Sequence, residues 1–137
     1  MKPLIAAAAA LLALAACGPK AAQEAKQASA AIPCPGLPAY APLYPGAKVT
    51  LCTQGDSTPG KIGGAVGFTS PAAPDVIVAR YRAGAAAAGL TPGLDLDQAG
   101  SKVFSAQDGD RTMRIQALPE AAGGSTAILT WGAAKPS

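Results

Sequence analysis

Alternating apolar and polar positions recur along the second half of the chain, and they predict an antiparallel sheet. In the segment 112–118, Met113, Ile115 and Ala117 alternate with polar side chains, so one face of this strand is expected to be dry and the other wet. Similar segments separated by turn residues predict five strands in total. Their ranges are 48–53, 65–68, 102–106, 112–118 and 126–131.

A helix is predicted between the second and third strands. Ile77, Tyr81 and Ala85 recur at helical spacing, and Gly89 provides a stop signal. Ser70 is expected to cap the first turn. The element order is then β-β-α-β-β-β. The simplest way to bury both apolar surfaces is an α+β fold, with one helix packed on one face of a small antiparallel sheet of about five strands.

The first 16 residues have the features of a secretory signal peptide. Lys2 is followed by a run of Ala, Leu and Ile over 4–16. As a helix this run would measure about 20 Å, too short for the hydrocarbon core of about 30 Å that a spanning helix must cross. We therefore predict a leader that is removed, and not a permanent transmembrane helix.

The leader ends in Leu14-Ala15-Ala16-Cys17, which resembles the lipobox of bacterial lipoproteins. This resemblance implies cleavage before Cys17 and attachment of a diacylglyceryl group to its thiol, with three acyl chains of the palmitate type in a Gram-negative host. Residue 18 is Gly and not the Asp that retains enteric lipoproteins in the inner membrane. The predicted location is the cell envelope, on the outer membrane facing the periplasm, and the inner membrane remains an alternative.

The composition of the rest of the chain divides it into three parts. Residues 17–31 are rich in Ala, Gln, Lys and Ser and are expected to form a lipidated flexible tether. Residues 32–133 are expected to form the single α+β domain, and residues 134–137 a C-terminal tail. The domain begins with a proline-rich stretch, in which Tyr40 and Tyr44 are predicted to anchor the chain against the sheet.

Once Cys17 is acylated, Cys34 and Cys52 are the remaining thiols in an oxidising compartment, and we expect them to form a disulfide. Alternation along 48–53 places Cys52 on the face opposite Val49 and Leu51. The bridge is therefore expected on the side away from the main core. A separation of 18 residues does not suit a redox-active CxxC pair.

Few residue types in this sequence support catalysis or cofactor binding. There is no histidine, which excludes the Ser-His and Cys-His triads, and no motif predicts a metal or cofactor site. The candidate acid-base groups are Asp95, Asp97, Asp108 and Asp110, which lie in loop-like sequence. Eleven basic side chains, one of them Lys2, are scattered singly against eight acidic ones, so nucleic-acid binding is not expected.

The segment Leu43-Tyr44-Pro45-Gly46-Ala47, with the strand and helix that follow and the helix end at Ala88-Gly89-Leu90, resembles a domain of uncharacterised small envelope proteins. The resemblance spans roughly 80 residues and implies a fold but no reaction. We expect a non-catalytic accessory or binding module held to the membrane through Cys17, with an envelope protein, peptidoglycan or a small ligand as partner. The alternatives are an inhibitor or immunity lipoprotein and a carboxylate-dependent hydrolase.

Overall fold

The computed structural model describes residues 32–137. The predicted signal peptide (1–16), the lipidation site Cys17 and the tether (17–31) lie outside these residues. The described part contains one helix and six strands. They are β1 (Lys48–Thr58), β2 (Lys61–Ser70), α2 (Pro74–Ala87), β3 (Thr91–Gln98), β4 (Ser101–Asp108), β5 (Arg111–Pro119) and β6 (Ser125–Ala134).

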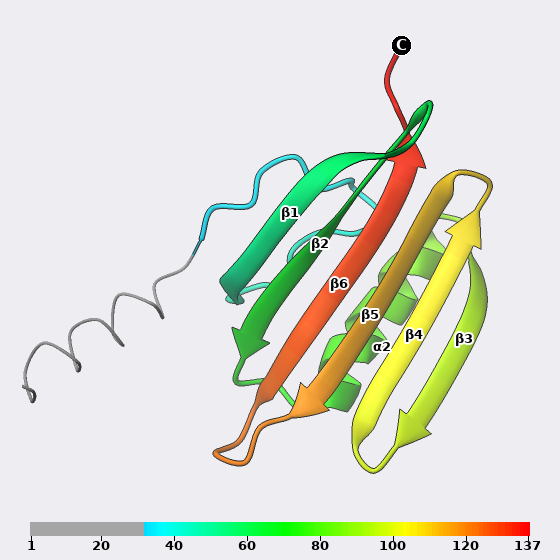
Figure 1. Cartoon of the computed structure of the whole chain (residues 1–137). Helices are drawn as coiled ribbons and strands as arrows, with labels where there is room; N and C mark the ends of the chain where they lie inside the picture. The colour runs from blue at the N-terminus through cyan, green and yellow to red at the C-terminus, as the bar shows by residue number, and fades with distance from the viewer. Residues whose placement is uncertain (1–31) are drawn as a thin grey trace, which may run out of the picture.

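The strands form one antiparallel sheet in the order β1-β2-β6-β5-β4-β3. Helix α2 packs on one face, against β3, β4 and β5, and leaves the other face open to the viewer in Figure 1. The predicted α+β fold is confirmed, with six strands where about five were expected. Strands β4 and β5 form a hairpin, in which Asp108 pairs with Arg111 across a two-residue turn.

The additional strand is β3, a segment whose sequence is typical of a loop. Pro92 and Gly93 remove the strand signal from this part of the sequence, because both residues are rare inside strands. The structure accommodates them because β3 is an edge strand that pairs only with β4 and is irregular between Pro92 and Asp95. Such irregularity protects an exposed sheet edge from pairing with another chain.

Helix α2 begins later than predicted. Its N-cap is Ala73, in an extended conformation and without a side-chain cap, and Pro74 is the first helical residue. The residue before a proline disfavours helical backbone, which explains why the helix starts only here. Ser70 instead accepts a hydrogen bond from the Ala72 amide at 3.1 Å. The predicted stop is confirmed, since Gly89 follows the helix with a φ of 76°. Residues 32–137 include no helix with the length and apolar character that crossing a membrane requires.

The proline-rich residues 32–47, called the strap here, cover the part of the sheet that α2 leaves bare. The strap runs behind β1 and β2, on the helix side (Figure 1). Ala41 is fully buried, and the Tyr44 ring stacks on Phe68 with centroids 6.2 Å apart. The Tyr40 hydroxyl donates a hydrogen bond to the Gly132 carbonyl. The predicted anchoring by Tyr40 and Tyr44 is therefore confirmed.

A β-bulge in β1 changes the face on which Cys52 lies. Val49 pairs with Phe68 and Leu51 with Gly67, so Thr50 is an extra residue in the ladder. The insertion brings Cys52 opposite Val66, whose side chain is in the core. The prediction that the bridge lies away from the core is wrong, because strict alternation fails at a bulge.

The glycines of β2 bring that strand close to its neighbours. A Cβ on Gly64 would lie 2.4 Å from the Thr53 carbonyl oxygen and 3.0 Å from the indole nitrogen of Trp131. The Trp131 side chain therefore fills the space next to Gly64 and belongs to the hydrophobic core.

Candidate functional site

The disulfide between Cys34 and Cys52 is present, with Cα atoms 5.6 Å apart. Both residues are half-buried and pack against the core. Beside the bridge, the Gln54 side chain donates a hydrogen bond to the Pro35 carbonyl, and the Ile32 amide donates to Val49. The bridge thus joins the beginning of the strap to β1, so its role is to stabilise the fold.

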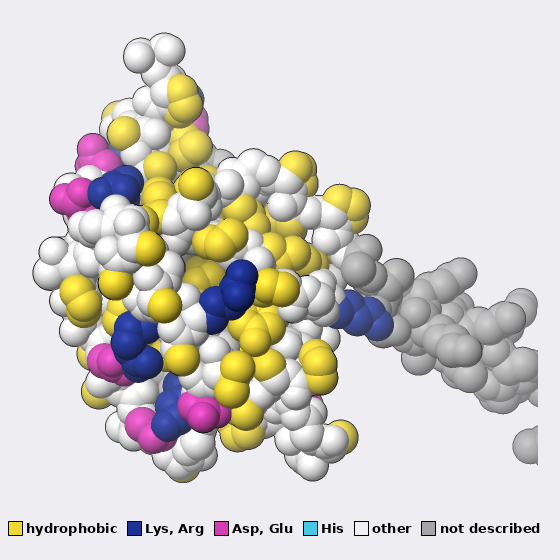
Figure 2. Space-filling view, turned by 180° about the vertical axis from the view of Figure 1, so that it is seen from behind, with side chains coloured by type: hydrophobic (Ala, Val, Ile, Leu, Met, Phe, Trp, Pro, Cys, Tyr) yellow, Lys and Arg dark blue, Asp and Glu magenta, His cyan; other side chains and the backbone are white. Residues whose placement is uncertain are grey.

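The four aspartates that sequence analysis considered for acid-base chemistry each pair with a different basic residue. The pairs are Asp95 with Arg82, Asp97 with Lys102, Asp108 with Arg111, and Asp110 with Lys61. Figure 2 shows the helix side of the molecule, where acidic and basic side chains lie beside one another along its edge. These carboxylates are used as partners of local cations and are not grouped around a cleft.

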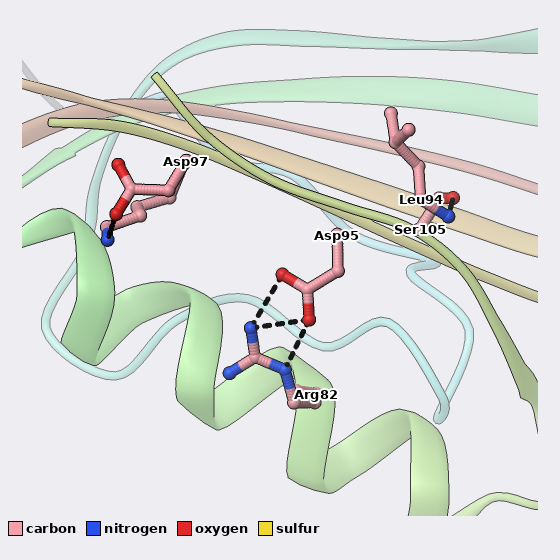
Figure 3. A network of polar contacts seen from close by, with 6 residues as sticks. Arg82, Leu94, Asp95, Asp97 and Ser105 are labelled. Atoms are coloured by element: carbon pink, nitrogen blue, oxygen red, sulfur yellow. Dashed lines mark hydrogen bonds and ion pairs between the residues drawn. The ribbon is translucent and has the colours of Figure 1, made fainter. Parts of the chain in front are cut away.

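The Asp95 pair is the best defined of these contacts. The Arg82 guanidinium on α2 donates to both carboxylate oxygens from Nε and a terminal nitrogen, at 2.9 to 3.1 Å (Figure 3). Arg82 also lies over the Phe104 ring, 5.4 Å from its centroid. The pair docks the helix on β3, which gives Asp95 a structural role. Among residues 32–137, no group of three or more acidic or cysteine side chains is arranged to hold a metal ion.

A groove of about 530 Å³ lies between α2 and the strap. It is lined by Tyr40 and Pro42 of the strap and by helical residues that include Arg80, Tyr81 and Gly84. The Tyr81 hydroxyl donates a hydrogen bond to the Pro42 carbonyl at 2.8 Å. Burial raises the pKa of Tyr81 well above its ordinary value, so this donor keeps its proton. The tyrosine hydroxyl thus joins α2 to the strap and is not a reactive group.

The open face of the sheet carries large apolar side chains. An antiparallel sheet often exposes one face to water, but that face is usually polar. Here Leu51, Leu94, Leu96, Leu118 and Ile128 are each 39 to 45% exposed. One row crosses all six strands, from Leu96 through Val103, Gln116, Ile128 and Gly67 to Leu51. Figure 3 shows Leu94 directed away from the helix, opposite to Asp95.

Arg114 stands among these residues on the open face. In the register, it lies between Ser105 on β4 and Thr130 on β6. The other three arginines each lie over an aromatic ring, and two of them also pair with an aspartate. Arg114 has no ion pair with any side chain of residues 32–137. Its charge is therefore directed at the solvent side of the sheet.

Two shallow depressions meet at Arg114. The larger, of about 340 Å³, has a mixed lining, in which Ser105, Gln107 and Thr112 lie beside Ala106, Met113 and Trp131. The smaller, of about 220 Å³, is lined by Gln116 and Ile128, and both depressions share Arg114 and Thr130. A cation thus lies between a hollow with several hydrogen-bonding side chains and a smaller hollow that contains the exposed Ile128 side chain.

Comparisons of the chain with protein-family models, curated proteins and solved structures give no match. The function of the open face is therefore inferred from its own residues.

The sequence placed Arg114 on the polar face of its strand but did not single it out as a site. The available signal was the alternation of Thr112, Arg114 and Gln116 with buried residues. Its significance depends on the exposure of this face among residues 32–137 and on the neighbours from β4 and β6. Those neighbours are distant in sequence, so the cluster appears only after the strands pair.

Proposed function

We propose that this protein is a lipid-anchored, non-catalytic binding module of the cell envelope, and that the open face of its sheet binds the partner. The observation that carries the proposal is the set of exposed aliphatic side chains on that face, with Arg114, which has no ion pair within residues 32–137, among them. Apolar patches of this kind are typical of interaction sites. The leader and lipobox support an outer-membrane anchor facing the periplasm.

A non-catalytic role is favoured over a carboxylate-dependent hydrolase. Glycosidase-type chemistry needs two carboxylates facing one cleft about 5 to 9.5 Å apart. Here Asp95 and Asp97 are each neutralised by a local cation, and so are Asp108 and Asp110 in the hairpin. The inhibitor or immunity lipoprotein is a special case of the binding module in which the partner is an enzyme.

Site-specific photo-crosslinking in intact cells tests the binding surface. A benzophenone amino acid in place of Ile128 is expected to give one discrete adduct with the partner. Its ring would replace an exposed aliphatic side chain of the open face. The control position is Val76, which is similarly exposed but lies on α2. An adduct from position 76 without one from position 128 would contradict the proposal. An enzyme identified in the adduct would favour the inhibitor form.

The anchor is tested separately by the intact mass of the native product. Cleavage before Cys17 and addition of three acyl chains are expected, and Cys17→Ser should abolish both, because serine cannot form the thioether. The wild-type protein should fractionate with membranes and the variant precursor should carry no added lipid. A wild-type product released without acyl chains would overturn the lipoprotein assignment.

A further inference from the structure

We propose that Arg114 binds the terminal carboxylate of a peptide whose last side chain is aliphatic, with the carboxylate in the larger depression beside Ser105 and the side chain against Ile128. This inference rests on the proposed function, because it names the chemistry that the open face recognises.

The charge of the site matches a single carboxylate. Arg114 is the one charged side chain that lines the two depressions, and it has no acidic partner among residues 32–137. Its planar guanidinium donates in the fork geometry that suits a carboxylate. A phosphate monoester carries nearly two charges at neutral pH, and these depressions offer no second cation to balance it.

The neutral side chains around Arg114 supply further hydrogen bonds. The Ser105 Oγ accepts a hydrogen bond from the Leu94 amide at 2.9 Å, which leaves its own proton available to donate. Thr112 adds a second hydroxyl, and Gln107 adds an amide that both donates and accepts. These groups suit a terminal carboxylate and the peptide bond that precedes it, because that peptide bond has its own N–H and C=O.

The apolar half of the site lies next to Arg114 on the same face. Gln116 is two residues along β5, about 7 Å away at the rise of a strand, and pairs with Val103 and Ile128. The Ile128 side chain is exposed and lines the smaller depression. Arg114 itself also lines the smaller depression, so the charge borders this apolar side chain directly. The site therefore fits an aliphatic residue at a peptide end.

The test is an NMR titration of the ¹⁵N-labelled full chain with N-acetyl-leucine. We expect shifts of the amide signals of 105–107, 112–114 and 128–130, and no saturable shifts with N-acetyl-leucinamide, which lacks the charge. Arg114→Gln should weaken binding at least about tenfold, since a charge-assisted hydrogen-bond pair is lost. Arg114→Lys should bind with intermediate affinity, because it keeps the charge but not the planar fork.

The matched control is Arg80→Gln, because Arg80 also lacks an ion pair within residues 32–137 but lies over Tyr44 on the helix side. It should bind N-acetyl-leucine like the wild type. Equal binding of the amide probe, or unchanged binding by Arg114→Gln, would overturn the inference. Tighter binding of octanoate than of N-acetyl-leucine would also overturn it, by assigning the site to a fatty acid.

The outcomes separate this inference from the proposed function. A crosslink at position 128 without any binding of the probe would reject the peptide carboxylate and retain the binding surface. Binding of the probe without a crosslink would retain the carboxylate site and reject a macromolecular partner on the open face.

Discussion

Leu129→Ala is expected to lower the free energy of unfolding by about 2 to 5 kcal/mol. Leu129 is fully buried in the middle of β6, between Ile115 and Val66 on the neighbouring strands. Truncation removes apolar contacts and leaves a cavity that the sheet cannot collapse around. Urea denaturation followed by far-ultraviolet circular dichroism measures the change.

The adjacent Ile128 provides the control for this experiment. It lies on the same strand and has a side chain of the same size, but it is 42% exposed on the open face. Ile128→Ala should cost less than about 1 kcal/mol, because much of its side chain already contacts water. Equal losses for the two variants would show that the open face is covered in solution. A larger loss for Ile128→Ala would show that the helix packs on the other face.

Loss of the Cys34–Cys52 bridge is expected to cost about 3 kcal/mol in a Cys34→Ser, Cys52→Ser double variant. The bridge closes a loop with a sequence separation of 18, and a loop of this length stabilises the fold by restricting the unfolded chain. The strap would then be held only by its non-covalent contacts, among them those of Tyr40, Ala41 and Tyr44. The measurement is again urea denaturation, with the variant and the wild type compared at equal concentration.

A reducing agent gives the internal control for the bridge. It should bring the stability of the wild type to that of the double variant and leave the variant unchanged. A wild type that is equally stable with and without the bridge would contradict a stabilising role. In that case the strap would be held by its aromatic contacts and not by the covalent link.

Local patterns predicted the strands that alternate cleanly and missed the one that does not. The buried and exposed faces of β5 follow from the positions of Met113, Ile115 and Ala117, because successive side chains of a strand point to opposite faces. Strand β3 could not be found this way, since Pro92 and Gly93 oppose strand formation. It exists because β4 offers a free edge and because Arg82 and Lys102 pair with its two aspartates.

The sequence by itself determined the type and order of most elements, the cysteine pairing and the anchoring role of the strap tyrosines. Residue spacing, turn chemistry and the count of thiols are local or additive properties, so they can be read without coordinates. Only the tertiary structure decided the face of Cys52, the edge strand β3 and the cluster at Arg114. A bulge shifts every later side chain by one face, and ion pairs and depressions join strands that are far apart in sequence.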